Sequence, residues 1–574
     1  MRKLARFLKN YRLQVILGPI FKLTEAVFEL IVPIVTADII DNGVRTGDVG
    51  YVWRMGGVML LLGVVGLCCA LVCQKMASIA SQGFGTVLRN EMYRHINTFS
   101  HKEIDRFGTP SLITRITNDV NQLQYAVAML IRLVIRAPFL ALGAVVMAML
   151  IDLPLAIVFL VATPLIGLVL YLVMSQSVPY FKVMQKKLDR ISLISREGLS
   201  GARVIRAFCK EEAQYQEFEQ KNRTLTTRQR RAGWISGLMN PITYLLVNFA
   251  IAWLIYTGAL EVSVGVLKPG EVVALYNYMG QILVELIKLA NLIVTMNKGL
   301  ASWKRITDVL NIKPDMDSPE KPVPAIVNDE AVRFDHVSLQ YNNAGAESLT
   351  DIDFTALRGQ TIGVIGGTGS GKSSVVGLIP RFYDATSGAV YVDGVDVRDQ
   401  DEATLRSKIG FVMQKAVLFH GTIRDNLRWG KPDATDAELN EAIAAAQADD
   451  VVKAKGGLDA MIEQNGRNLS GGQRQRLTIA RALVRKPEIL VLDDSASALD
   501  QATDLNLRLA IRRLDYHPTV FIVSQRTASI LAADQILVLD DGKAVGMGTH
   551  EALLESCPVY REIYESQYGG EAKA

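Results

Sequence analysis

The sequence predicts an all-α domain of six membrane-spanning helices at residues 1–310, a linker at 311–330 and an α/β domain at 331–574. Three observations support this fold class. The chain has 574 residues, more than one hydrophobic core usually serves. Its first half contains six apolar runs of membrane-spanning length. Its second half contains a glycine-rich phosphate-loop pattern between an apolar strand and a helix, the context that this pattern requires.

The six apolar runs lie at residues 14–40, 55–77, 126–151, 155–179, 234–260 and 272–295. Each can cross about 30 Å of hydrocarbon as a helix. The connections after the second and fourth runs are long and basic, with thirteen Lys or Arg between residues 180 and 231. Because basic loops stay on the cytoplasmic side, both termini and the α/β domain are predicted to be cytoplasmic, in a chain that crosses the inner (plasma) membrane repeatedly. The first run lacks a small-residue cleavage site and is predicted to be a retained span.

Helical periodicity continues through the long connections at residues 77–99 and 183–218, so the membrane helices are predicted to extend into the cytosol. Residues 1–13 combine basic and apolar side chains and are expected to lie along the inner leaflet. Residues 311–330 are rich in proline and acidic side chains and have no apolar period, which is typical of a linker.

Charged side chains inside the spans indicate what the membrane domain handles. In the first span, Lys22, Glu25 and Glu29 are three and four residues apart and share a helix face, with Glu29 near mid-membrane. The sixth span carries a second polar stripe that ends at Lys288. Together the stripes could line a water-filled cavity, but Glu285 and Lys288 could equally form a plain ion pair. Arg136 in the third span is assigned to neither. The residues predicted to line the cavity are Glu25, Glu29, Gln281 and Glu285.

The α/β domain contains GGTGSGKS at residues 366–373, which fits the phosphate-loop pattern GxxxxGK[ST]. Glycines let backbone N–H groups surround phosphates, and the following helix points its N-terminus at their charge. We expect Lys372 to contact the β- and γ-phosphates of ATP, and Ser373 and Asp493 to hold Mg²⁺. The predicted cofactors are therefore ATP and Mg²⁺. The residues expected to bind ATP here are Gly366, Gly367, Thr368, Gly369, Ser370, Gly371, Lys372, Ser373 and Ser374.

The motif LSGGQ at residues 469–473 lies shortly before the apolar strand that ends in Asp493. The phosphate loop, LSGGQ and this strand, in that order after six spans, resemble the ATP-binding cassette (ABC) family, specifically half-transporters of the exporter type. The resemblance covers essentially the whole chain. It implies a transmembrane domain of ABC exporter type fused to a P-loop ATP-binding cassette, an ATPase coupled to transport. It also implies that four residues close over the ATP of the opposite subunit in a head-to-tail dimer: Ser470, Gly471, Gly472 and Gln473.

The resemblance assigns roles to residues outside the phosphate loop. Tyr341 stands where the family stacks an aromatic ring on adenine, with a core tyrosine as the alternative. Gln414 stands where the family's glutamine contacts Mg²⁺ and the membrane domain. Short coupling helices are expected near residues 107–112 and 200–208, the second docking on the partner's cassette.

Two positions depart from the family pattern. Asp494 replaces the glutamate that polarises the attacking water, and Gln525 replaces the histidine of the switch loop. The aspartate is one methylene shorter, which withdraws its carboxylate by about 1.5 Å. A misplacement of about 1 Å can cost on the order of 10²-fold in rate. Because Lys372, Ser373 and Asp493 are intact, the sequence predicts a site that binds ATP and hydrolyses it slowly.

Two slow sites would make a poor pump, so the predicted assembly is a heterodimer with a second, non-identical half-transporter. The chain resembles the degenerate-site subunit of bacterial heterodimeric multidrug exporters, with small amphipathic or cationic molecules as the expected cargo. A homodimeric slow exporter of lipid or peptide and an ATP-gated sensor or regulator are the alternatives. The net charge of +4 gives no case for nucleic-acid binding. The five cysteines form no CxxC pair, so neither a zinc site nor a disulfide framework is predicted.

Overall fold

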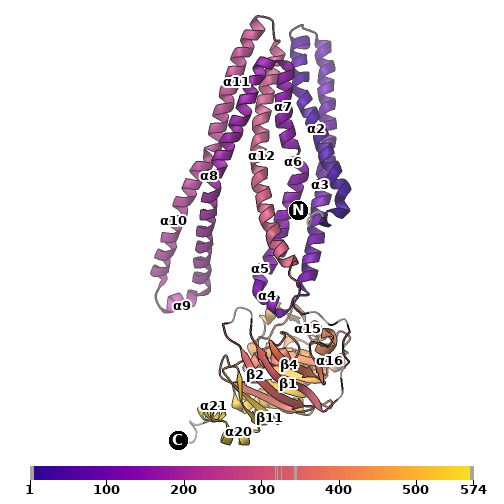
Figure 1. Cartoon of the computed structure of the whole chain (residues 1–574), viewed down its shortest axis with the longest axis vertical. Coiled ribbons are helices and arrows are strands. Elements are labelled where there is room, and N and C mark those ends of the chain that lie inside the picture. Colours follow the sequence, from indigo (N-terminus) through magenta and orange to yellow (C-terminus); the bar gives the residue numbers. More distant parts are fainter. Residues whose placement is uncertain are drawn as a thin grey trace. The chain divides into compact units, whose positions relative to one another are not determined.

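The computed structural model describes residues 6–316, 319, 321–324, 326, 328–341 and 345–568. It divides into two compact units (Figure 1). The helical unit comprises Met1–Asn97 and Pro110–Ile312, and the α/β unit comprises Thr98–Thr109 and Lys313–Ala574. The predicted N-terminal amphipathic segment lies partly outside the described residues, and its described part continues into the first long helix.

The helical unit is built from long helices that run beside one another (Figure 1). Leu, Ile, Val and Ala dominate their spans, and tightly packed alanines such as Ala26, Ala144 and Ala274 are fully buried between them. The helices are α2 Arg12–Asp38, α3 Val49–Ile96, α6 Val120–Leu133, α7 Arg136–Ile151, α8 Leu153–Ser200, α10 Glu211–Gly237, α11 Met239–Ser263 and α12 Pro269–Leu310.

Five helical stretches are long and apolar enough to cross a membrane, by length and composition. The sequence predicts six spans, and the difference is the first one. Its helix, α2, carries Lys22, Glu25 and Glu29 near its middle, which makes it the most highly charged of the predicted spans. The five stretches are Val49–Ile96, Thr109–Ile151, Leu153–Ser200, Glu211–Ser263 and Pro269–Leu310.

Prolines interrupt two of these stretches. The predicted third span is not one helix, because α6 ends at Leu133 and α7 begins at Arg136. Pro138 has no N–H to donate to the carbonyl four residues earlier, and its ring crowds that carbonyl. Pro241 has the same effect at the junction of α10 and α11. The first break leaves Arg136 at a helix N-terminus, facing other helices.

Three short helices lie at turns between the long helices: α4 His101–Phe107, α5 Thr109–Thr114 and α9 Ala202–Ala207. The last lies inside the predicted range 200–208. The first turn differs from the predicted range 107–112, because Gly108, at φ +73°, separates α4 from α5. A capping box between Ser100 and Glu103 fixes the start of α4.

Helix α4 packs within the α/β unit, so residues 98–109 group with that unit although the sequence division puts them with the membrane domain. The His101 ring lies 4.6 Å from the Phe382 ring, and the Tyr383 hydroxyl donates to Asp105 Oδ2 at 2.9 Å. Burial, with Arg406 nearby, lowers the pKa of His101, so its imidazole is neutral at neutral pH. An aromatic and hydrogen-bonded contact, which sequence spacing does not reveal, therefore holds α4.

The α/β unit contains a six-stranded sheet in the order β12-β11-β3-β10-β9-β6. All neighbours pair in parallel except β11 with β12. The Val- and Ile-rich runs of β9 and β10 are buried along their whole length, as strands covered on both faces are. Its strands are β3 Thr361–Gly366, β6 Ile409–Val412, β9 Ile489–Asp493, β10 Thr519–Val523, β11 Gln535–Asp540 and β12 Lys543–Gly548.

An antiparallel sheet in the order β2-β1-β4-β5 packs beside the first, around a core that includes Phe334, Phe354 and Phe521. Its strands are β1 Glu330–Leu339, β2 Leu349–Leu357, β4 Ser387–Val392 and β5 Val395–Asp396, and β7 Gly421–Thr422 pairs with β8 Met461–Ile462. The helices of this unit are α13 Lys372–Leu378, α14 Glu402–Lys408, α15 Ile423–Arg428, α16 Asp436–Ala445, α17 Asp449–Lys455, α18 Gly471–Leu483, α19 Gln501–Arg512, α20 His550–Ser556 and α21 Pro558–Tyr568.

Candidate functional site

The carboxyl ends of five parallel strands meet at one edge of the six-stranded sheet, where ligands of open α/β sheets bind. Val523 of β10 is in register with Val364 of β3 and with Asp493 of β9. The loops that leave these ends line a cavity of about 580 Å³. Its lining includes most of the predicted nucleotide residues, namely Tyr341, Thr368, Gly369, Gly371, Lys372, Ser373, Ser374, Gln414, Asp493, Asp494 and Gln525.

The phosphate loop runs from the end of β3 to the start of α13. Gly371 has φ +95°, and a Cβ there would meet a carbonyl oxygen at 2.9 Å, so only glycine fits this turn. The Lys372 ammonium donates to the carbonyls of Gly366 at 2.9 Å and Gly367 at 2.6 Å, which folds its side chain over the loop. Burial lowers the pKa of Lys372, and the carboxylates of Asp493 and Asp494 oppose that effect.

Ser373 and Asp493 lie together, although 120 residues separate them in the chain. The Ser373 hydroxyl donates to Asp493 Oδ1 at 2.9 Å. Burial raises the pKa of Asp493, and the adjacent Asp494 carboxylate raises it further, while Ser373 and Lys372 act in the other direction. A hydroxyl and a buried carboxylate at this spacing are the pair of oxygen ligands that Mg²⁺ takes beside phosphates.

Asp494 follows directly, with a backbone φ of +46°. This left-handed conformation is uncommon for residues other than glycine, and aspartate adopts it more readily than most. The backbone N–H of Asp494 donates to the Val523 carbonyl at 3.0 Å, and Gln414 Nε2 donates to Asp494 Oδ2 at 3.2 Å. The structure therefore brings Gln414, which follows β6, into contact with the Asp494 carboxylate.

Gln525 is exposed and lies in the loop after β10. Gln567, near the end of α21, forms hydrogen bonds to this loop. Its Nε2 donates to the Gln525 carbonyl at 2.8 Å, and its Oε1 accepts from the backbone N–H and the hydroxyl of Thr527. Sequence reasoning missed Gln567, because a glutamine near the chain end carries no motif.

Tyr341 borders the cavity and is partly buried. Its hydroxyl donates to Ser374 Oγ at 3.0 Å, and its ring packs edge-on against Tyr383, with centroids 4.9 Å apart. Burial raises the pKa of the Tyr341 hydroxyl, so it remains a neutral donor. Tyr383 is a second residue without a sequence signal. It contacts Tyr341 on one side and Asp105 of α4 on the other.

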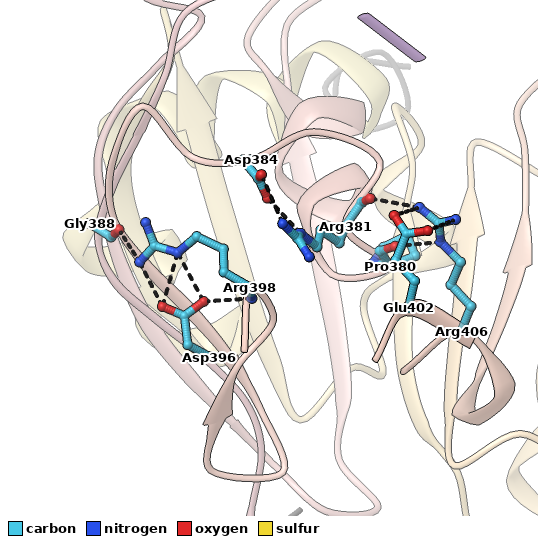
Figure 2. Close-up of polar contacts among 8 residues, drawn as sticks. All are labelled: Pro380, Arg381, Asp384, Gly388, Asp396, Arg398, Glu402 and Arg406. Atoms are coloured by element: carbon cyan, nitrogen blue, oxygen red, sulfur yellow. Dashed lines mark hydrogen bonds and ion pairs between the residues drawn. The ribbon is translucent and has the colours of Figure 1, made fainter. Parts of the chain in front are cut away.

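The turn that presents Tyr383 is held by arginines (Figure 2). Arg406 donates to the carbonyls of Pro380 at 3.1 Å and Arg381 at 2.9 Å, and Arg381 donates to Asp384 at 2.8 Å. The two backbone carbonyls precede Tyr383 in the chain and Asp384 follows it, so these bonds hold the turn on both sides of Tyr383. The three arginine–carboxylate pairs in the view are Arg381–Asp384, Arg398–Asp396 and Arg406–Glu402.

The predicted cavity residues of the helical unit form ion pairs. Arg136, only 8% exposed, donates to Glu29 Oε2 of α2 at 2.6 Å and to Glu285 Oε1 of α12 at 2.9 Å. Lys288 also pairs with Glu285, at 2.8 Å. Glu285 is 1% exposed, whereas Glu29 is 40% exposed. The sequence left Arg136 unassigned, and the structure makes it the link among three helices.

These ion pairs bear on the cavity predicted from the polar side chains of the first and sixth spans. Glu285 is buried and pairs with both Arg136 and Lys288, which is the contact that the ion-pair alternative describes. Glu25 pairs with Lys22 at 2.6 Å. Gln281 is half-buried, and its Oε1 has no hydrogen-bond partner in the described part of the chain. Glu29 alone keeps an exposed carboxylate.

Comparisons with known proteins agree with this architecture. Residues 15–286 match the family model of the ABC transporter transmembrane region, and residues 349–497 match the ABC transporter model. An uncharacterized ABC transporter ATP-binding protein of Mycobacterium tuberculosis (strain CDC 1551 / Oshkosh) is 40% identical over 570 residues, covering 98% of this chain and 97% of that protein. The chain belongs to the ABC transporter family.

Two further similarities place it among ABC exporters. A probable multidrug resistance ABC transporter ATP-binding/permease protein of Bacillus subtilis (strain 168), YheI, is 31% identical, covering 99% of this chain and 97% of that protein. A solved bacterial Atm1-family ABC exporter with ATP bound has the same fold, with a TM-score of 0.80 at 23% identity, covering 97% of this chain and 99% of that chain. The chain is thus an exporter half-transporter whose cassette is an ATPase coupled to transport.

The signature motif of this ABC exporter lies apart from the cavity. Ser470 is the N-cap of α18 and forms a capping box with Gln473, whose amide oxygen accepts from the Ser470 N–H at 3.0 Å. Ser470 and Gly471 are exposed, and none of the described residues that line the cavity comes from the motif. This helix N-terminus therefore remains available to an anion bound outside this chain's own cavity.

The cavity residues fit MgATP. The Ser370 hydroxyl is buried within the phosphate loop and has no hydrogen-bond partner among the described residues, so a phosphate oxygen would satisfy it. Lys372 and the N-terminus of α13 supply positive charge. Ser373 and Asp493, with Gln414 nearby, would hold Mg²⁺, which neutralises charge on the phosphates.

Proposed function

We propose that this chain is the degenerate-site subunit of a heterodimeric ABC exporter of small amphipathic molecules. The observation that carries the proposal is the pair Asp494 and Gln525 beside an intact set of ATP-binding groups, Lys372, Ser373 and Asp493. Such a site would bind ATP tightly and hydrolyse it slowly.

The geometry supports slow hydrolysis. Asp494 is held by its backbone bond to Val523 and by Gln414. A carboxylate about 1.5 Å short of the glutamate position polarises water poorly, because general-base catalysis requires hydrogen-bond reach to the attacking water. Gln525 cannot exchange a proton as an imidazole does. Both changes affect hydrolysis and leave the phosphate contacts in place.

A heterodimer follows from the intact signature motif. Ser470 and the N-terminus of α18 would complete a second ATP site on another cassette. An intact signature motif has a use if that second site hydrolyses ATP rapidly. The partner would then supply the glutamate and histidine that this chain lacks. A homodimer would contain two slow sites.

The cargo class rests on the membrane unit and on a relative. Glu29 keeps a 40% exposed carboxylate on α2, which can attract an amphipathic cation. YheI, which is similar over nearly the whole chain, is a probable multidrug resistance ABC transporter. We propose small amphipathic molecules, cations among them, as the cargo.

The test compares Lys372→Ala with Gly471→Asp in the purified complex. Lys372→Ala should leave part of the steady-state ATPase, because the partner's site keeps its own lysine. Gly471→Asp should nearly abolish it, since the new carboxylate faces the γ-phosphate of the partner's ATP. A Cβ at Gly471 would lie 3.8 Å from the Ala498 side chain, an ordinary van der Waals contact, so the variant can fold. Gly471→Ala, which adds no charge, is the matched control and should retain most activity.

Equal and complete loss from Lys372→Ala and Gly471→Asp would refute the asymmetric assembly. Co-purification of a second half-transporter separates the heterodimer from the homodimer. ATP-dependent flux in vesicles separates both exporters from an ATP-gated regulator.

A further inference from the structure

Six basic side chains form an exposed band on the second cytoplasmic hairpin of the helical unit, α8 with α10 (Figure 1). In the described part of the chain, none of the six makes a hydrogen bond or ion pair. We call them the basic band: Lys182, Lys186 and Lys187 on α8, and Arg228, Arg230 and Arg231 on α10.

The two halves of the band lie at similar depths along the hairpin. Helices α8 and α10 are joined through α9 and pack antiparallel, with Arg190 paired to Glu217 at 3.9 Å. At about 1.5 Å per residue, all six residues lie roughly 20–30 Å from the α9 end. They also lie within about 12 Å of the predicted spans 155–179 and 234–260. The band therefore sits just outside the expected edge of the hydrocarbon.

No acidic residue occurs at 175–188 or at 220–237, and Asp189, one turn from Lys186, accepts a hydrogen bond from Gln185, so the six cations outnumber the carboxylates near them. The first cytoplasmic hairpin differs. There Arg89 of α3 donates to the side-chain oxygens of Asn121 and Gln124, and Asp119 pairs with Arg305 of α12. Arg89 thus has polar partners, whereas the six cations of the band have none among the described residues.

Aromatic residues flank the band on its membrane side. Trp234 is 73% exposed and Phe181 is 43% exposed. Tryptophan concentrates where a helix crosses the headgroup layer. Exposed aromatic residues next to exposed cations are typical of helices that contact lipid headgroups.

We propose that the basic band is a binding surface for anionic phospholipid headgroups of the inner leaflet. Phosphate groups provide the missing counter-charge at the depth where the six cations lie. Basic residues next to a membrane span associate with anionic lipid in this way. The surface is separate from the ATP cavity, and the proposal does not depend on the exporter being heterodimeric.

The test measures lipid preference directly. The assembled full-length exporter is reconstituted in phosphatidylcholine vesicles with trace spin-labelled phosphatidylglycerol or spin-labelled phosphatidylcholine. The motionally restricted fraction of each label gives the relative association. The triple variant Lys182→Gln, Lys186→Gln, Lys187→Gln removes three charges from the band, and Arg228→Gln, Arg230→Gln, Arg231→Gln is the independent second variant.

The chain offers a matched control at the far end of the hairpin, where Arg203, Arg206 and Lys210 are also exposed. Replacing these three with glutamine removes the same charge about 20 Å or more from the band. We expect the parent to prefer phosphatidylglycerol by roughly fivefold or more, since each cation near an anionic surface is worth about that factor. Either band variant removes three of the six cations and should reduce the preference by roughly fivefold or more, and the control should keep it.

Preference retained in both band variants, or lost equally in the control, would overturn the proposal. So would a band variant that releases a partner subunit without changing lipid preference, because the band would then be a protein contact. Lys→Arg at the three α8 positions keeps the charge and should restore the preference. In the parent, raising the salt to about 0.5 M should weaken it, as screening requires.

Discussion

Asp494→Glu should increase ATP hydrolysis at this chain's own site. The substitution adds the methylene that the family's glutamate has and advances the carboxylate by about 1.5 Å. The neighbouring groups that hold the phosphates and Mg²⁺ are present, because Lys372, Ser373 and Asp493 line the same cavity. The variant therefore repairs one component of a site that is otherwise assembled.

The expected gain follows from that displacement. Correcting a misplacement of about 1 Å is worth on the order of 10²-fold, which corresponds to about 2.7 kcal/mol of barrier. Gln525 still lacks an imidazole, so we expect about tenfold from Asp494→Glu alone and more from Asp494→Glu with Gln525→His. A cost is also expected. Glutamate is less suited than aspartate to φ +46°, which should lower the stability of the cassette by roughly 1 kcal/mol.

The assay is steady-state ATPase of the isolated chain and of the complex, with thermal unfolding of each variant measured alongside. Asp494→Asn is the matched control, since asparagine tolerates the same backbone and cannot act as a base. It should show no gain. Hydrolysis by Asp494→Glu at the parent's rate, in a variant that is folded and binds ATP, would refute the argument that carboxylate reach limits this site.

Three further predictions concern other contacts. Arg136→Gln should destabilise the membrane unit by up to about 3–5 kcal/mol, because it leaves the buried Glu285 with Lys288 as its one remaining cation, and thermal unfolding in nanodiscs measures this. Arg136→Leu with Glu285→Leu should lose less. Asp493→Asn should remove the Mg²⁺-dependent part of ATP affinity, whereas ATP binding in EDTA should change little. An equal loss of affinity with Mg²⁺ and in EDTA would contradict the assignment of Asp493 to Mg²⁺. Glu29→Gln should reduce vesicle transport of cationic cargo more than of neutral cargo, whereas equal loss would indicate a structural role.

The nucleotide site could be predicted from the sequence because its groups follow strand ends. Lys372, Ser373 and Asp493 are fixed by motifs whose spacing requires a strand, a loop and a helix. Parallel strands then bring their carboxyl ends to one edge without further information. The fold class follows from the same patterns, since six apolar runs and a phosphate loop leave few architectures open.

Contacts between distant segments could not be predicted in this way. Tyr383 links Tyr341 to Asp105 of α4, and Gln567 holds the loop of Gln525, yet neither residue belongs to a periodic pattern. The position of α4 in the α/β unit depends on such contacts. The break before Arg136 has a local cause, Pro138, but the two carboxylates that Arg136 contacts lie on other helices and were not predictable from spacing.

The two carboxylates of the Arg136 cluster, Glu29 and Glu285, differ in burial and in the cations that contact them. Arg136 and Lys288 carry two positive charges, and Glu29 and Glu285 carry two negative charges. A membrane interior accepts such a set because it is neutral as a whole. Glu285, at 1% exposure with both cations on one oxygen, serves this balance. Glu29 accepts only one hydrogen bond in the described chain and is 40% exposed, so its second oxygen remains available to a cation from outside.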